Sequence, residues 1–360
     1  MRHKICLIFI ILFAGLTAFA QANHDYSNAV DGYFTIHNFP FQSHETALPL
    51  LKIHYTTLGK PIKDKSGKVT NAVLIMHGTG SSNRGFLTQQ FAGILFGSGQ
   101  LLDTAKYYII LPDGIGHGKS SKPSDGLHMK FPKYTYDDMV AVYYRLLTEH
   151  LGVNHLRLTM GTSMGGMQTW MFGYLYPGFS DALLPLASLP VPIAGRNRMM
   201  RKMAINLIEA DPEWKGGDYT SPPAQGLMGA GSSLFFMGSS PLQLQKESPS
   251  RQQSDMMAYE MQKGYTKMDA NDLIYQLDAS RNYDPSPYLD QIKAPLFAIN
   301  SADDQINPPE LGIMEREIKK VAKGRYILLP ITDQTRGHGT NSLPAIWDNY
   351  LKELLSVSGQ

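Results

Sequence analysis

Short apolar stretches alternate with helical patterns along most of this chain. Several stretches are continuously apolar, which is typical of strands buried on both faces of a mostly parallel sheet. This order of strands and helices predicts an α/β fold with a doubly wound, mostly parallel sheet. We predict strands at residues 32–37, 50–59, 71–76, 107–112, 156–160, 182–189, 295–300 and 325–330, and helices at residues 136–151, 166–176 and 344–356.

The alternation stops between residues 191 and 286, where the pattern is helical and rich in Met, Pro, Gly and Ser. We interpret this segment as a helical lid inserted into an α/β core formed by residues 21–190 and 287–360. Methionines at helical spacing indicate core packing more often than a binding surface, but a lid over a cleft also favours such adaptable side chains. The methionines concerned are Met199, Met200, Met203, Met256, Met257 and Met261.

Residues 1–20 are typical of a secretory signal peptide. A basic start at residues 2–4 precedes an apolar run at residues 5–16, and Ala18 and Ala20 form the small-residue pattern of a cleavage site. The apolar run is short for a membrane span, although an uncleaved anchor stays open as an alternative. We expect cleavage near Ala20, a secreted or periplasmic mature protein, and no stable membrane insertion after cleavage.

The cysteine content and the net charge exclude several classes of function. The one cysteine, Cys6, lies inside the predicted signal peptide, so we expect a mature chain with neither a thiol nucleophile nor disulfides. The formal net charge is +2, and no basic stretch is interleaved with aromatic residues. We therefore expect no nucleic-acid partner. We expect no cofactor and no metal, because no pair of His, Asp or Glu side chains has ligand spacing on one element.

One stretch carries the clearest chemical signal. Residues 161–165, GTSMG, match the pattern G-x-S-x-G and stand between a predicted strand and a predicted helix. That context is typical of a nucleophile elbow, the strained strand-to-helix turn of the α/β-hydrolase fold. Gly161 and Gly165 leave room for the two backbones to close up. We predict Ser163 as the nucleophile, with the free N–H groups of the following helix turned toward the site.

A serine hydroxyl needs a base, and the base needs an anion to orient it. Candidate side chains follow the last two predicted strands, and parallel strands bring such loops to the same edge of the sheet. We therefore predict Asp304 as the orienting acid and His338 as the base. Asp303 is the alternative acid, and we prefer Asp304 because the Asn-Pro turn after it places it where the strand end opens.

The loop after residues 71–76 is expected to supply a backbone N–H to an oxyanion hole. We place this donor at Thr79, with Gly80 as the near alternative, beside the N–H of Met164. His77 opens the same loop, but it precedes the elbow and closes a strand, so we expect it to be structural.

The glycine-rich loop at residues 113–120, DGIGHGKS, admits a competing interpretation as a phosphate-binding loop. It matches neither the full Walker pattern nor a complete G-x-G-x-x-G that opens a helix. We therefore assign no phosphate to this loop.

At the elbow, the sequence resembles a known family. Residues 161–168, GTSMGGMQ, are similar to the elbow of the homoserine O-acetyltransferases. Residues 211–219, DPEWKGGDY, and 269–271, DAN, resemble two lid segments of that family, and Asp304 and His338 fall where its triad acid and base fall. The resemblance covers most of the mature chain. It implies an α/β-hydrolase fold, a covalent acyl-serine intermediate and a lid over the acyl site.

These features predict a secreted serine esterase that acts on a small-molecule acyl ester. Two alternatives stay open: an acyltransferase of the resembled family that uses acetyl-CoA, and a binding protein that has kept the fold. We expect hydrolysis, because an acyl-enzyme outside the cytoplasm meets water as its commonest acceptor. The oxyanion loop at residues 77–80 also looks like that of ordinary hydrolases.

The sequence does not assign the residues that bind the substrate. Arg196, Arg198 and Arg201 are candidates for a substrate-binding arginine because they lie at the start of the predicted lid. A monomer and a homodimer are both compatible with the sequence.

Overall fold

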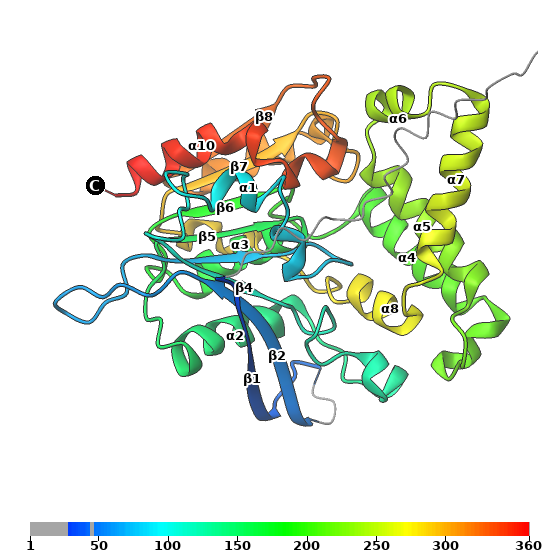
Figure 1. Cartoon of the computed structure of the whole chain (residues 1–360), viewed down its shortest axis with the longest axis horizontal. Coiled ribbons are helices and arrows are strands. Elements are labelled where there is room, and N and C mark those ends of the chain that lie inside the picture. The colour runs from blue at the N-terminus through cyan, green and yellow to red at the C-terminus, as the bar shows by residue number, and fades with distance from the viewer. Residues whose placement is uncertain (1–27, 44–46, 360) are drawn as a thin grey trace, which may run out of the picture.

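Among the residues that the structure describes, eight strands form one sheet at the centre of the molecule (Figure 1). The computed structural model describes residues 28–43 and 47–359, so the predicted signal peptide lies outside the described residues. The strands follow the order β1-β2-β4-β3-β5-β6-β7-β8 across the sheet. Their bounds are β1 (Val30–Phe39), β2 (Leu48–Leu58), β3 (Ala72–Met76), β4 (Tyr108–Pro112), β5 (Leu158–Thr162), β6 (Leu183–Leu186), β7 (Leu296–Ser301) and β8 (Gly324–Leu329).

The sheet is parallel from β4 to β8, whereas β1 and β2 form an antiparallel pair at one edge and β2 runs antiparallel to β4. The predicted α/β fold with a mostly parallel, doubly wound sheet is confirmed. The strand predicted at residues 182–189 is too long at its C-terminal end. Ala187 has a φ of +49°, so the chain leaves the sheet after Leu186.

Helices cover both faces of the sheet, as the side chains of β3 illustrate. Leu74 and Met76 belong to a core shared with α2 and α3, whereas Val73 and Ile75 belong to a second core shared with α1 and α10. Successive side chains of a strand point to opposite faces, so burial on both faces produces a continuous apolar run. These helices are α1 (Ala92–Leu95), α2 (Tyr136–Arg145), α3 (Met164–Leu175) and α10 (Pro344–Val357).

The predicted helices are present, with two differences at their ends. The helix predicted at residues 136–151 continues beyond α2 as a π-helical turn at Leu146–His150. The helix predicted to begin at Gly166 begins at Met164, because the turn at Ser163 occupies a single residue. Within residues 28–43 and 47–359, no helix has both the length and the apolar character that a membrane crossing needs.

A helical segment connects β6 to β7 and lies at one end of the sheet (Figure 1). It meets the loops that follow β7 and β8: Arg196 donates two hydrogen bonds to the side chain of Gln305, and Ser239 packs on Gly337. The predicted domain boundaries at residues 190 and 286 stay predictions. The segment contains α4 (Gly195–Glu209), α5 (Ala224–Gly238), α6 (Pro241–Glu247), α7 (Arg251–Tyr265) and α8 (Ala270–Asp278).

The methionines of this segment do not form one buried stripe. Met200 is buried, but Met199, Met203 and Met256 have exposed fractions of 61%, 52% and 45%. The expectation that such methionines pack in a core is therefore wrong for these three. Spacing along a helix identifies a shared face but does not say whether another element covers that face.

Helix α3 lies unusually close to the strands beneath it. A Cβ atom added to Gly165 would lie 1.9 Å from the carbonyl oxygen of Met76, and one added to Gly161 would lie 2.3 Å from the carbonyl group of Gly165. Contacts below 3.0 Å with backbone atoms force the backbone to move. The close approach that we predicted for these two glycines is present.

We expect Gly165→Ala to destabilise the protein by about 1–3 kcal/mol, as overpacking of a well-packed interior does. The matched control is Gly264→Ala, because a Cβ at Gly264 in α7 meets no atom within 4 Å. That control is expected to be neutral or to stabilise slightly by restricting the unfolded chain. Urea unfolding checks both variants, and equal midpoints would contradict the steric argument.

Candidate active site

Ser163 occupies the turn between β5 and α3. Its φ is +54° and its ψ is −110°, a conformation that costs a non-glycine residue of the order of 1–3 kcal/mol. The turn is fixed by hydrogen bonds on both sides: the Ser163 amide donates to the carbonyl of Leu186 at 2.9 Å, and the Ser163 carbonyl accepts from the amide of Met167 at 2.9 Å. These two backbone hydrogen bonds therefore hold Ser163 in its strained conformation.

The structure brings Ser163, His338 and Asp304 into one hydrogen-bonded chain. His338 lies in a short 3₁₀ helix after β8, and Asp304 lies in the loop after β7. The Nε2 atom of His338 is 2.7 Å from Ser163 Oγ, and its Nδ1 atom is 2.8 Å from Asp304 Oδ2. This arrangement fits a neutral imidazole that donates from Nδ1 to the carboxylate and accepts the serine hydroxyl proton at Nε2.

The carboxylate of Asp304 is fully buried but well supplied with donors. Its Oδ1 atom accepts from the amides of Ile306 and Asn307 at 2.8 and 3.2 Å, and its Oδ2 atom accepts from the side chain of Asn307 at 3.0 Å. Burial alone raises the pKa of Asp304, but the charge and hydrogen bond of His338, with these donors, outweigh burial and lower the pKa below its usual value. The group is therefore a carboxylate at neutral pH.

Asp303, the alternative acid, has a different set of partners. Its Oδ1 atom accepts from Ser301 Oγ at 2.5 Å, and its Oδ2 atom accepts from the backbone amide of Gly337 at 2.9 Å. The structure thus places Asp304 on the histidine ring and Asp303 on the backbone just before it. Asp303 fixes the position of the loop that carries His338.

Asn307 is a site residue that we did not predict. Its side-chain amide donates to Asp304 and also to the carbonyl of Ala187, at 2.9 Å. It therefore ties the end of β6 to Asp304, which follows β7. The Asn-Pro sequence after Asp304 indicated a turn, but no local pattern indicates that the asparagine side chain bridges two strand ends.

The two predicted oxyanion donors lie in segments that meet at Ser163. Met164 is the first residue of α3, and a Cβ added to Gly78 would lie 3.4 Å from the Cβ of Ser163. Thr79 follows directly, and its hydroxyl is enclosed without a hydrogen-bond partner within the described part of the chain. The role of the Thr79 and Met164 amides as oxyanion donors stays a prediction.

His77 has both ring nitrogens engaged in structural hydrogen bonds. Nδ1 lies 2.9 Å from the carbonyl of Gly78, and Nε2 accepts from the amide of Gly114 at 3.0 Å. Burial lowers the pKa of His77, and burial also lowers the pKa of the neighbouring His117 to about 3. Both rings are therefore neutral at physiological pH, and His77 links two loops as expected.

The glycine-rich loop at residues 113–120 encloses a carboxylate of its own. Asp113 is buried, and its Oδ2 atom accepts from the amide of Lys119 at 2.9 Å and contacts His54 Nδ1 at 2.8 Å. A Cβ at Gly118 would lie 2.2 Å from that carboxylate. The glycine makes room for Asp113, which explains the spacing that superficially resembles a phosphate loop.

The three candidate arginines have different environments. Arg196 is engaged with Gln305, the residue after Asp304. Arg201 is buried and donates to Asn197 Oδ1 at 3.0 Å. Arg198 has its Nη1 atom enclosed without a hydrogen-bond partner among the described residues. None of these contacts assigns a substrate-binding role.

The lid sequences behind the family resemblance brace the helical segment internally. Trp214 donates from its indole N–H to Asn271 Oδ1 at 2.9 Å, and Asn271 donates to the carbonyl of Gly217 at 2.8 Å. The hydroxyl of Tyr219 donates to Asp269 Oδ2 at 2.6 Å. These side chains join the turn after α4 to the start of α8, so their role here is structural.

Comparisons with known proteins agree with the fold. A family model described as alpha/beta hydrolase fold matches residues 71–326. The chain is 30% identical over 313 residues to a "Probable acyltransferase" of Methanothermobacter thermautotrophicus, covering 86% of this chain and 93% of that protein. It is 30% identical over 279 residues to the homoserine O-acetyltransferase of Haemophilus influenzae, covering 70% and 75%.

Among solved structures, an acetylester hydrolase from Corynebacterium glutamicum aligns with a TM-score of 0.79 at 22% identity, covering 91% of this chain and 96% of that one. At that identity the likeness shows the fold alone. The sequence relatives and the family model also show the family to which the chain belongs. The chain belongs to the α/β-hydrolase fold family, in its homoserine O-acetyltransferase-like group.

Proposed function

We propose that this enzyme is a serine hydrolase that cleaves carboxylic esters through an acyl-serine intermediate. The observation that supports this proposal best is the hydrogen-bonded chain from Ser163 Oγ through the His338 ring to Asp304. A serine in such a chain loses its proton to the imidazole as it attacks, and the carboxylate stabilises the imidazolium that forms.

In the proposed reaction, Ser163 Oγ attacks the ester carbonyl carbon and its proton passes to Nε2 of His338. The carbonyl oxygen becomes an oxyanion, and the amides of Thr79 and Met164 are its proposed donors. When the tetrahedral intermediate collapses, His338 returns the proton to the leaving alcohol. Water then attacks the acyl-serine, gives its proton to His338, and the same ring reprotonates Ser163 as the acid leaves.

Acyl transfer is the second candidate, and the names of the relatives favour it. Both sequence relatives reported above are named as acyltransferases, whereas the structural neighbour is named as a hydrolase. In a transferase, acetyl-CoA would acylate Ser163 and an alcohol would replace water in the second step. The two reactions share the triad and differ in the acceptor.

The N-terminal sequence supports hydrolysis over transfer. We propose that residues 1–20 direct the chain out of the cytoplasm, since they combine a basic start, an apolar run and a small-residue cleavage pattern. An acyl-enzyme in that location has little access to acetyl-CoA. Water is then the acceptor at the highest concentration.

Ser163→Ala is expected to abolish hydrolysis of p-nitrophenyl acetate, and Asp304→Asn to lower kcat by roughly 10⁴-fold, because the histidine loses the anion that fixes its tautomer. Asp303→Asn is the matched comparison. It leaves the ring contact intact and is expected to cost far less. Steady-state kinetics provide the measurement. If Asp303→Asn lowers kcat as much as Asp304→Asn does, Asp303 is the orienting acid.

Thr79→Pro removes the proposed oxyanion donor, whereas Thr79→Ala keeps it and removes only the hydroxyl. We expect the proline variant to lose about 10²–10³-fold in kcat. The alanine variant should stay within a few-fold of the parent. If the two variants have the same kcat, the donor lies elsewhere, with the Gly80 amide as the next candidate.

Product analysis separates hydrolysis from transfer. With acetyl-CoA and homoserine, we expect no more O-acetylhomoserine than the Ser163→Ala variant gives, and with p-nitrophenyl acetate we expect acetate as the product. Mass spectrometry of both mixtures provides the measurement. Formation of O-acetylhomoserine that depends on Ser163 would replace the esterase proposal with the transferase.

A further inference from the structure

Asn307 lies against both Asp304 and the ring of His338, yet the reaction proposed above gives it no role. Its side chain is buried. The side-chain nitrogen, Nδ2, lies 3.0 Å from Asp304 Oδ2, 2.9 Å from the carbonyl oxygen of Ala187 and 3.5 Å from Nδ1 of His338. The first two contacts assign the orientation of the amide, because its nitrogen and not its oxygen must face a carbonyl and a carboxylate.

The end of β6 directs this amide toward Asp304. A side-chain amide carries two N–H hydrogens, and the carbonyl of Ala187 accepts one of them. The carbonyl of the preceding residue, Leu186, accepts from the amide of Ser163 at 2.9 Å. Adjacent carbonyls of one strand end therefore hold both Ser163 and Asn307. The second hydrogen of the Asn307 amide is left to bond Asp304 Oδ2.

Asn307 and His338 share one oxygen of the carboxylate. Nδ1 of His338 lies 2.8 Å from Asp304 Oδ2 and donates to it, so the 3.5 Å contact between the two nitrogens joins two donors on the same acceptor. Burial raises the pKa of Asp304, whereas the charge and hydrogen bond of His338, followed by the hydrogen bond of Asn307, lower it below its usual value. The Asn307 amide thus stabilises the same negative charge that stabilises the ring once it is protonated.

We propose that Asn307 is a positioning residue that acts on His338 through Asp304. By bonding Oδ2, its amide takes up part of the carboxylate charge and leaves less of that charge to hold a proton on the ring. The ring can then accept the proton of Ser163 at a lower pH than it could without Asn307. This inference rests on the function proposed above, in which His338 is the base.

Other charged or titratable side chains lie around these residues, on their loops, on β8 and on the adjacent helices, namely Asp303, Arg336, Tyr326, Arg196 and Glu247. Asp303 bonds the Gly337 amide, and Arg336 pairs with Glu247. Burial, with the charges of Glu315 and Asp304, raises the pKa of Tyr326, so this phenol is neutral. In the described part of the chain, Oδ2 of Asp304 accepts hydrogen bonds from His338 and Asn307 alone. A substitution of Asn307 therefore changes the sharing of Oδ2 and leaves these other contacts in place.

The test measures how fast a fluorophosphonate labels Ser163 in the full chain, from about pH 5 to pH 9. In this reaction Ser163 Oγ bonds to phosphorus, fluoride leaves and the serine proton passes to His338, so the rate follows the neutral ring. We expect Asn307→Leu to move the rise of the rate to higher pH by about 0.5–1 unit, a roughly 3–10-fold tighter hold on the proton. The rate at high pH should fall less than about tenfold, because two backbone amides still hold Oδ1.

Asn300→Leu is the matched control. Asn300 is also buried and also joins β7 to the segment after β6, since it accepts from the amide of Ser188 at 3.1 Å and donates to its carbonyl at 3.4 Å. Each leucine variant leaves two buried groups without a hydrogen bond, so a general loss of stability affects both. The pH dependence of labelling should stay unchanged in Asn300→Leu. Asn307→Ala guards against misfolding of Asn307→Leu, because it removes the same donor without overpacking, and it should shift the rate in the same direction.

An unchanged pH dependence in the Asn307 variants, or an equal shift in Asn300→Leu, would overturn the inference. So would a shift to lower pH, because the ring would then have lost the carboxylate. A parent chain that is not labelled at Ser163 would contradict this inference and the proposed function together. A labelled parent that shows the expected shift but does not hydrolyse p-nitrophenyl acetate would support the role of Asn307 and contradict only the esterase proposal.

Discussion

The contact between the start of α3 and the carbonyl of Met76 is the constraint on which the rest of the site depends. Only a residue without a Cβ fits at Gly165, because an added Cβ would lie 1.9 Å from that oxygen. This approach places the first turn of α3 against the ends of β3 and β5, and Ser163 must then adopt a φ of +54°. The strain of that turn is balanced by packing of the largely buried helix, so the serine is held in place before any substrate binds.

The position of His338 beside this serine depends on contacts with two different parts of the chain. The Gly337 amide donates to Asp303 on the core side, and the same glycine packs on the Ser239 carbonyl on the side of the helical segment. The backbone before His338 is thus held between the core and the helical segment, while Asp304 holds the ring. A change in the position of α5 or α6 is therefore expected to change the surroundings of His338, even though Ser163, His338 and Asp304 all lie outside these two helices.

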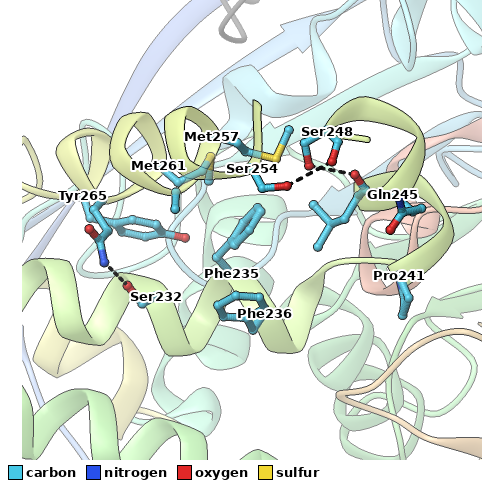
Figure 2. Close-up of a pocket in the computed structure, with 13 residues that line it drawn as sticks. Ser232, Phe235, Phe236, Pro241, Gln245, Ser248, Ser254, Met257, Met261 and Tyr265 are labelled. Carbon is cyan, nitrogen blue, oxygen red and sulfur yellow. Dashed lines mark hydrogen bonds between the residues drawn. The ribbon is translucent and has the colours of Figure 1, made fainter. Parts of the chain in front are cut away.

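Much of the fold, and the meeting of Ser163, Asp304 and His338 at one edge of the sheet, could be predicted from the sequence for a physical reason. Buried parallel strands produce continuous apolar runs, and the G-x-S-x-G turn needs glycines at fixed positions, so both leave local patterns. Asn307 and Asp303 leave none, because their roles arise from contacts with Ala187 and Gly337, which lie far away in the chain. The same limit applies to the exposed Met199 and Met203, since periodicity defines a face but not what covers it. The open groove between α5, α6 and α7, where Phe235, Met257 and Met261 lie (Figure 2), depends on how three helices pack, so the sequence did not predict it.

In the mechanism that we propose, the choice between hydrolysis and transfer does not depend on Ser163, His338 and Asp304, because both candidate reactions pass through the same acyl-serine. It lies in what reaches the acyl group after the first alcohol or thiol has left. At the start of α4, Arg196 donates to Gln305, which follows Asp304 in the chain, and Arg198 has an enclosed nitrogen without a partner among the described residues. The lid sequences that resemble the transferases are used for internal bracing between Trp214 and Asn271. A structural role therefore explains their presence, which does not favour transfer over hydrolysis.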